Sequence, residues 1–188
     1  GKPIPSLQSI DHEEKVIYLG TFSKSIAPSL RISYMVLPLH LLKKYQESCS
    51  FYSTTVSKIQ QEVLREFIRG VYFGRHLNKM RGIYKNKHDF LVGELKKKNW
   101  VQNIAGDNAG LHVLVQVNTT LTEEEICKKA AECGIRLMGI REHYIHTPPE
   151  GRPVLLLGYG KPDEQEIQKG LEVLESIVLE NRIPLPLR

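Results

Sequence analysis

Residues 20–31 read GTFSKSIAPSLR, and this stretch decides the fold of the chain. An apolar run at residues 16–19 leads into it, and a second run at residues 32–37 follows it. The pattern predicts a strand, a hydroxyl-rich loop with one lysine, Lys24, and an arginine, Arg31, at the start of the next strand. A partly desolvated, neutral lysine amine forms a Schiff base with an aldehyde, and hydroxyls together with an arginine hold a phosphate. The stretch therefore indicates a site for pyridoxal phosphate.

A plainer interpretation of the same residues stays open. Most lysines are solvated surface charges, and Lys24 would then have no chemical role. Arg31 would likewise form an ion pair on the surface. The cofactor site is favoured by the whole string of residues and not by the lysine alone.

The string resembles the lysine segment of fold-type I aminotransferases, and most closely that of the aminotransferase-like domain of GntR-family, MocR-type transcriptional regulators. The segment of these regulators has the form Y-x-G-T-F-S-K-x-x-x-P-x-L-R-x-G-Y. The residues of this chain that match it are Tyr18, Gly20, Thr21, Phe22, Ser23, Lys24, Pro28, Leu30, Arg31 and Tyr34. Ser33 departs from the pattern, because the family usually has glycine there, but the lysine and the arginine are in place.

The resemblance implies a role for each polar residue of the segment. Lys24 would form an internal aldimine with pyridoxal 5'-phosphate, and Arg31 would hold the phosphate of the cofactor. Thr21 and Ser23 would donate hydroxyl hydrogen bonds to the same phosphate, and Thr21 is the better match to the family position.

A second stretch also carries the resemblance. Residues 109–112 read AGLH and match the opening of a strand in the small domain of these regulators. The glycine permits close approach of the backbone near the mouth of the site. His112 is interpreted as a hydrogen-bonded strand histidine, and direct contact with the cofactor is the minor alternative.

A third stretch matches with one departure. Residues 155–160 read LLLGYG and correspond to the strand that carries the substrate-carboxylate arginine in aminotransferases. Leu156 stands in that place, and a leucine side chain cannot pair with a carboxylate. Arg141 and Arg152, on nearby loops, are candidates to replace it. The departure favours a ligand sensor over an efficient amino-acid transaminase.

The composition is that of an ordinary water-soluble α/β protein. The chain has 188 residues, 41% hydrophobic and 25% charged, with a net charge of +5. No apolar run approaches the roughly 20 residues that a membrane-spanning helix needs. The densest basic run, residues 96–98, is interpreted as a solvated helix end, with a nucleic-acid patch as the alternative. Cys49, Cys127 and Cys133 form no CxxC pair, which favours reduced cytoplasmic thiols over disulfides or a metal site.

The order of the predicted elements gives the fold class. Helical periodicity is expected over residues 56–68 and 75–98, and again after residue 163. Between the last two lie strands at 100–104, 111–117, 135–138 and 154–157, with a capping box at residues 122–125 that opens a helix. This order predicts an α/β chain, with the end of a larger domain at residues 1–74 followed by a small α+β domain at residues 75–188, and the resemblance implies that the larger domain is the fold-type I, pyridoxal-phosphate-binding domain.

The resemblance also sets the expected biological role. Residues 1–5 read GKPIP, like a turn from the middle of a longer protein, so we expect a carboxy-terminal fragment of a cytoplasmic, homodimeric regulator. Its DNA-binding domain, and the aspartate that fold-type I sites use on the pyridine nitrogen, would lie upstream. The isolated fragment is therefore expected to bind the cofactor weakly or not at all.

The effector of such a regulator would be the cofactor itself or an amino compound, and two other functions stay open alongside it. The first is an aminotransferase that acts on an amino acid and uses Lys24 to move protons. The second is a non-catalytic dimerisation module that keeps a relict site.

Overall fold

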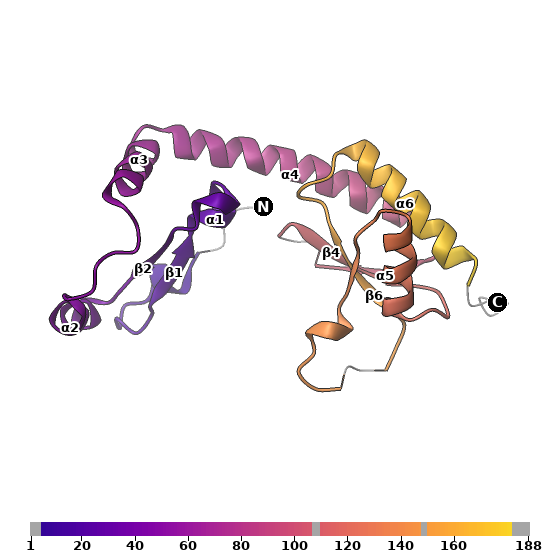
Figure 1. The fold of residues 1–188 in the computed structure, drawn as a ribbon, viewed down its shortest axis with the longest axis horizontal. Helices are drawn as coiled ribbons and strands as arrows, with labels where there is room; N and C mark the ends of the chain where they lie inside the picture. The colour runs from indigo at the N-terminus through magenta and orange to yellow at the C-terminus, as the bar shows by residue number, and fades with distance from the viewer. Residues whose placement is uncertain (1–4, 107–109, 148–149, 182–188) are drawn as a thin grey trace. The chain divides into compact units, whose positions relative to one another are not determined.

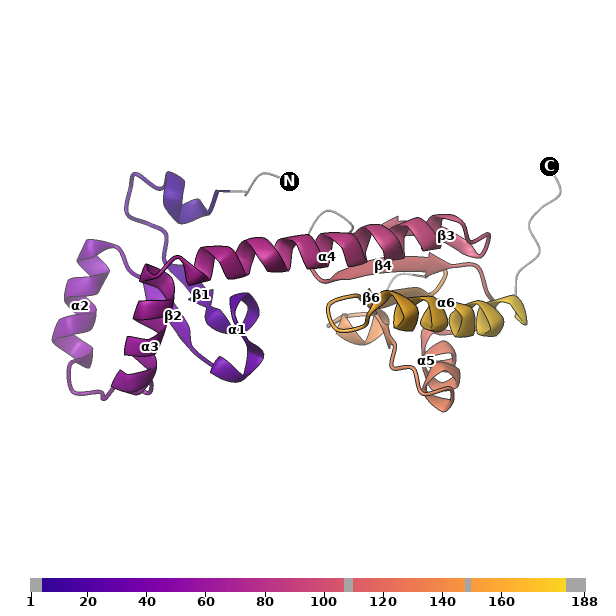
Figure 2. The same cartoon turned by 90° about the horizontal axis from the view of Figure 1, so that it is seen from above.

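A computed structural model describes residues 5–106, 110–147 and 150–181 (Figures 1 and 2). The chain forms two compact units, unit 1 over residues Gly1–Met80 and unit 2 over residues Arg81–Arg188. Helix α4 (Tyr72–Lys96) contains the boundary between them. The predicted division into domains between residues 74 and 75 stays a prediction.

Unit 1 is built around a two-stranded antiparallel sheet. Its elements are η1 (Leu7–Ile10), β1 (Tyr18–Thr21), α1 (Phe22–Ser25), η2 (Pro28–Leu30), β2 (Ser33–Val36), α2 (Leu39–Cys49), α3 (Lys58–Arg69) and the start of α4. The predicted sequence of strand, loop, strand and helices is confirmed. Helix α3 begins with a capping box, in which Ser57 and Gln60 bond each other's backbone N–H groups.

The first strand begins two residues later than predicted. The apolar run at residues 16–19 suggested a strand from Val16, but β1 starts at Tyr18. The carboxylate of Asp11 explains the difference, since its Oδ2 accepts the N–H groups of Lys15 and Val16, each at 2.7 Å. These bonds hold residues 11–16 in a turn, and the bond from Val16 is the first cause of a lowered pKa for Asp11.

The pairing of β1 with β2 explains why residue 20 is a glycine. Gly20 lies opposite Tyr34 in the register. A Cβ added to Gly20 would come within 2.7 Å of Cε1 of the Tyr34 ring and closer still to other ring atoms. The same ring lies 4.9 Å from the ring of Phe22, centroid to centroid, and its hydrogen bond with Tyr18 raises the pKa of Tyr34. Gly20 therefore leaves room for an aromatic ring to cross the strand.

Replacing Gly20 with alanine should loosen this hairpin by about 1 kcal/mol, because Tyr34 must move and lose its ring contact with Phe22. Amide hydrogen exchange of residues 18–21 should then be about fivefold faster. Gly74→Ala is the matched control, because a Cβ at that position meets no atom within 4 Å. Equal amide exchange rates in Gly20→Ala and Gly74→Ala would mean that the position of the Tyr34 ring does not depend on Gly20.

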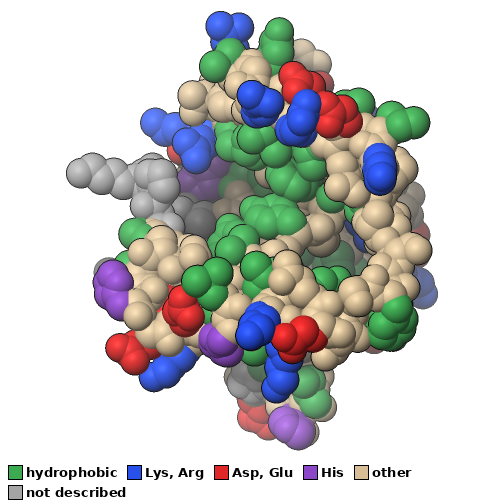
Figure 3. All heavy atoms as spheres, turned by 90° about the vertical axis from the view of Figure 1, so that its left-hand side faces the viewer, with side chains coloured by type: hydrophobic (Ala, Val, Ile, Leu, Met, Phe, Trp, Pro, Cys, Tyr) green, Lys and Arg blue, Asp and Glu red, His purple; other side chains and the backbone are tan. Residues whose placement is uncertain are grey.

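Unit 1 has very little buried core. Among the described residues, Ile32 is the only hydrophobic residue of unit 1 that is fully buried, at 7% exposure. Large apolar side chains are open instead, including Leu19 at 72%, Phe51 at 74% and Ile59 at 78% exposure. Figure 3 shows hydrophobic side chains, in green, gathered among the charged ones on the face that carries this unit. Exposed apolar surface of this kind is typical of protein, membrane or ligand contact sites.

Unit 2 is a four-stranded antiparallel sheet with helices packed on it. Its elements are the end of α4, β3 (Val101–Ala105), β4 (His112–Val117), α5 (Glu123–Glu132), β5 (Met138–Gly139), η3 (Arg141–His143), β6 (Val154–Gly158) and α6 (Glu164–Leu179). The strands lie in the order β3-β4-β6-β5. The predicted small α+β arrangement is confirmed. The predicted turn at residues 106–108 and the start of the AGLH stretch fall partly on residues outside the described part of the chain.

Alternate residues of the sheet form the core of unit 2. Val113, Val115 and Val117 of β4 and Leu155 and Leu157 of β6 are buried, whereas the residues between them are more open. They form one cluster with α4, α5 and α6. The period of two places every second side chain on one face of the sheet, which is the face that the helices cover.

Helix ends follow the predicted signals in unit 2. Thr122 with Glu125, and Asp163 with Glu166, form capping boxes at the starts of α5 and α6. The predicted strand at residues 135–138 is too long, because β5 has only two residues and pairs with β6 from Met138 onward. The chain leaves α5 through Gly134 at φ +78°, and the N–H of Ile135 still bonds the carbonyl of Ala130 at 2.9 Å.

A carboxylate joins the start of β3 to α6. Glu175 accepts a hydrogen bond from Nε1 of Trp100 at 3.1 Å and forms an ion pair with Lys98 at 2.7 Å. Trp100 is the chain's single tryptophan and is fully buried. The bond from Lys98, and then that from Trp100, lowers the pKa of Glu175. These contacts tie α6 to the connection between α4 and β3.

Within the described parts of the chain, no helix combines the length and apolar character needed to cross a bilayer.

Candidate functional site

The candidate lysine lies on a single helical turn directly after β1. Helix α1 spans Phe22–Ser25 and contains Ser23 and Lys24. Thr21 caps it, because its Oγ1 accepts the N–H of Ser23 at 3.2 Å. The N–H of Phe22 donates to the carbonyl of Ile32 at 2.9 Å, which fastens the turn to the buried start of the returning chain. The backbone directly before Lys24 is thus held by these two hydrogen bonds.

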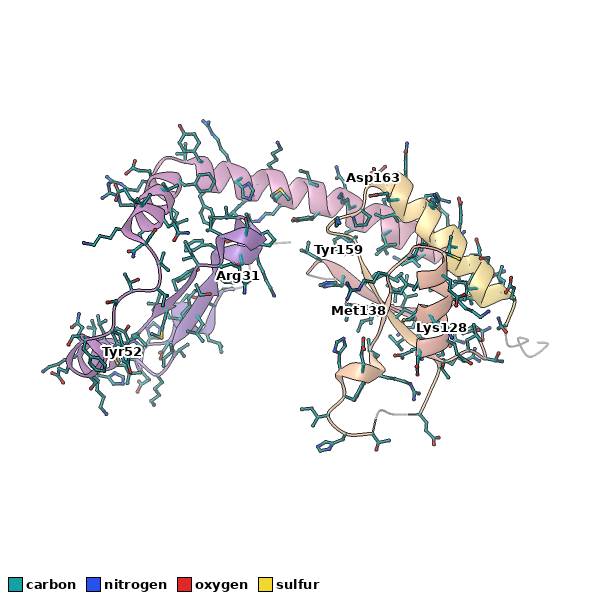
Figure 4. The ribbon with its side chains drawn as sticks, in the orientation of Figure 1. Arg31, Tyr52, Lys128, Met138, Tyr159 and Asp163 are labelled. Carbon is teal, nitrogen blue, oxygen red and sulfur yellow. The ribbon has the colours of Figure 1, made fainter. Side chains whose placement is uncertain are left out.

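Arg31 lies at the other end of the same connection. It ends η2 in the left-handed region, with φ 50° and ψ 31°, a conformation that is uncommon for a residue other than glycine. Figure 4 labels Arg31 beside α1. Because Thr21 pairs with Ser33 across the hairpin, Lys24 and Arg31 both lie on the short connection between two paired residues.

The polar side chains of this connection differ in whether they already form hydrogen bonds. Lys24 and Arg31 are exposed, and no described residue forms a hydrogen bond or an ion pair with either of their side chains. The Oγ1 of Thr21 donates to the carbonyl of Ile32 at 3.2 Å, so its proton is engaged by the backbone. Ser23 keeps its hydroxyl free of other described groups. A free amine, a free guanidinium and a hydroxyl on one connection are a donor set that suits an aldehyde bearing a phosphate.

In the third matched stretch, residues 155–160, the position matched to the aminotransferase arginine is the apolar residue Leu156. Leu156 on β6 pairs with Leu114 of β4 on one side and with Met138 of β5 on the other. These three apolar residues form a row across the sheet. His112 pairs with Gly158 and is exposed, which agrees with an ordinary strand histidine.

Arg141 and Arg152 lie together on a different part of unit 2. Both line a cavity of about 920 Å³ beside the start of α5. The Nε of Arg141 is 3.9 Å from a carboxylate oxygen of Glu123, and its Nη2 donates to the carbonyl of Gly151 at 3.4 Å. Arg141 is therefore already engaged by its own unit.

Glu123 is the residue that sequence reasoning missed. It is a buried carboxylate, 5% exposed, which accepts the N–H of Arg141 at 2.8 Å and the N–H of Val154 at 2.9 Å. Gly139 leaves the space for it, because a Cβ there would collide with the Glu123 side chain. The sequence shows only an acidic first turn after Thr122, where solvent-exposed glutamates are the usual case.

One known protein family matches most of this chain. The sequence pattern described as "Aminotransferase class I and II" matches residues 2–167, which include the Lys24 connection and most of unit 2. The chain belongs to the class I and II aminotransferase family.

Curated relatives of this aminotransferase-family chain include transcriptional regulators. It is 39% identical over 177 residues to "Uncharacterized HTH-type transcriptional regulator YdeL" of Bacillus subtilis, covering 94% of this chain and 38% of the relative. It is 30% identical over 191 residues to "Probable rhizopine catabolism regulatory protein MocR" of Rhizobium meliloti, covering 100% and 38%. The predicted resemblance to MocR-type regulators is confirmed.

Solved aminotransferases share the fold of this family member. Kynurenine aminotransferase of Pyrococcus horikoshii, solved in complex with PMP, superposes with a TM-score of 0.78 at 25% identity, covering 96% of this chain and 44% of that protein. The predicted fold-type I class is confirmed. The chain spans less than half the length of the curated relatives and of the solved structure that it matches.

Proposed function

We propose that this chain is the carboxy-terminal part of the effector domain of a cytoplasmic, homodimeric transcriptional regulator that binds pyridoxal 5'-phosphate at Lys24. The observation that carries the proposal is the connection between β1 and β2, which holds an unpaired lysine amine and an unpaired arginine between two paired residues. The regulators that match the chain supply the biological class.

Each residue of the connection has a task in this proposal. When bound, the cofactor supplies an aldehyde carbon, with which an amine condenses as water leaves. Lys24 would provide that amine. Arg31 binds the phosphate with its planar fork, and Ser23 donates its hydroxyl to the phosphate. Thr21 holds the turn in shape through its bonds to Ser23 and Ile32.

The effector that we propose is an amino compound. Its binding would shift a conformational equilibrium that the DNA-binding part of the regulator reads. The row formed by Leu114, Leu156 and Met138 offers no cation to a carboxylate. This row supports a sensor over an enzyme that must clamp an α-amino acid.

Replacing Lys24 with alanine in the full-length protein should abolish the change in cofactor absorbance that accompanies covalent attachment. The wild type should show the change on titration with pyridoxal phosphate. Lys58→Ala is the matched control, because Lys58 is also exposed but lies at the start of α3. A band that survives in Lys24→Ala, or that is missing from the wild type, would overturn the proposed site.

The isolated chain is expected to bind the cofactor weakly. Unit 1 leaves its apolar surface open, and the loss of one charged hydrogen bond from the remainder of the site costs about ten- to a hundredfold in affinity. The covalent absorbance of the 188-residue chain should therefore be weak even where the full-length protein gives a strong signal.

An aminotransferase is the second candidate function, because aminotransferases share the fold at a TM-score of 0.78. In that case Lys24 would also move a proton on the bound amino acid. Steady conversion of an amino donor and a keto acid by the full-length protein, lost in Lys24→Ala, would favour the enzyme over the sensor.

A further inference from the structure

A second cavity lies entirely within unit 2, on the flank of α6. It has a volume of about 410 Å³ and is bounded by α6, by β6 and by the segment that leaves α5. Its floor is made of core leucines, Leu91, Leu171 and Leu174, which are 2–3% exposed. This size and this apolar floor are typical of small-molecule sites. Figure 4 labels Asp163 at the start of α6 and Met138 on β5, two of the elements near it.

A glycine in the middle of α6 keeps the cavity open. Gly170 lines the cavity, and α6 runs from Glu164 to Leu179. Glycine is less favourable than alanine inside a helix, so a close packing contact usually accounts for it. That reason is absent here, because a Cβ built on Gly170 meets no atom within 4 Å. The missing side chain therefore preserves space, which a larger residue would fill.

Two of the three charged side chains that the structure describes in the lining of this cavity are positive. Arg136 and Lys161 line it and are exposed, and their side chains form no hydrogen bond or ion pair with any residue that the structure describes. The one carboxylate in the lining, that of Glu166, accepts the N–H of Asp163 at 2.9 Å as part of the capping box of α6. The cations are thus available to a ligand, whereas the anion is held by the helix.

We propose that this cavity binds an organic anion with an apolar body, a carboxylate on a hydrocarbon chain or ring. The hydrocarbon lies on Leu91, Leu171 and Leu174 beside Gly170, and the carboxylate lies between Arg136 and Lys161. The lining residues all belong to unit 2, and binding there requires no pyridoxal phosphate, so the test of this site does not depend on the proposed function.

Octanoate titrated into the whole chain tests the proposal. Methyl NMR should show saturable shifts of Leu91, Leu171 and Leu174, with 1-octanol binding more weakly. Gly170→Leu should abolish these shifts while the helix content and the melting temperature stay at or above the wild-type values. Gly82→Leu is the matched control, since Gly82 is also a helix glycine with open space but lies outside the cavity lining.

A charge variant keeps the test decisive if Gly170→Leu perturbs the fold. The double variant Arg136→Gln and Lys161→Gln should weaken octanoate binding by about tenfold and leave 1-octanol binding unchanged. Octanoate shifts that persist in Gly170→Leu, that gather on unit 1 instead, or that are indifferent to the double variant would overturn the proposal. So would the absence of saturable shifts in the wild type.

Discussion

Replacing Glu123 with alanine should lower the free energy of unfolding of unit 2 by about 3–5 kcal/mol. The carboxylate is 5% exposed and accepts two backbone N–H groups, those of Arg141 and Val154, at 2.8 and 2.9 Å. Alanine leaves both donors buried without an acceptor, removes one of the partners of the Arg141 guanidinium and opens a void beside Gly139. Each of these effects is destabilising, and all of them act on the junction of α5, β5 and β6.

Urea unfolding followed by the fluorescence of Trp100 measures this effect, because that tryptophan is buried in the core of unit 2. Glu124→Ala is the matched control, since Glu124 is the exposed neighbour of Glu123, and it should change stability by less than about 0.5 kcal/mol. Glu123→Gln should fall between the two variants, because the amide oxygen still accepts a hydrogen bond. A loss below about 1 kcal/mol in Glu123→Ala would show that water satisfies the two N–H groups.

The second large effect is expected at Arg31. In the full-length protein, Arg31→Gly should weaken pyridoxal phosphate binding by about ten- to a hundredfold, because a charged hydrogen bond to the phosphate is lost. Glycine is the informative substitution here. It adopts the φ of 50° that Arg31 has in the structure, so the backbone is kept and only the guanidinium is removed.

Absorbance titration with the cofactor gives the affinities. Arg31→Lys, which keeps the charge but not the planar fork, should give an intermediate affinity. Arg31→Val should also disturb the hairpin, since a branched side chain is strained at this φ. If Arg31→Gly binds the cofactor as tightly as the wild type, the phosphate is held by other groups and the role of Arg31 is wrong.

The elements were predictable from the sequence wherever a local rule acts alone. The capping box at Thr122, the helix that begins after residue 163 and the apolar strand at residues 111–117 need only neighbouring residues, and the structure confirms them. Local rules failed at the starts of two strands. The carboxylate of Asp11 delays the start of β1, and the exit from α5 through Gly134 shortens β5.

The residues described in and around the candidate site also fall into two groups, those that could be selected from the sequence and those that could not. Lys24 and Arg31 could be selected from sequence because both lie on one connection between paired strands. Glu123 could not, because its burial depends on Gly139 and on the backbone of Val154, which lie far along the chain. The hydrogen bond from the Thr21 hydroxyl to the carbonyl of Ile32 could not be predicted either, because it depends on how the chain folds back into β2. The roles in cofactor binding given to Thr21, Ser23, Lys24 and Arg31 stay predictions.

The unequal cores of the two units have a thermodynamic consequence. A single free energy of unfolding is meaningful only when the whole chain melts as one cooperative step. Here nearly all of the fully buried apolar side chains that the structure describes belong to unit 2, whereas unit 1 contributes Ile32. The slope of stability against denaturant scales with the surface that unfolding exposes. A calorimetric enthalpy or a denaturant slope measured on this chain therefore describes unit 2, and dividing it by 188 residues would understate the cooperativity of the part that unfolds.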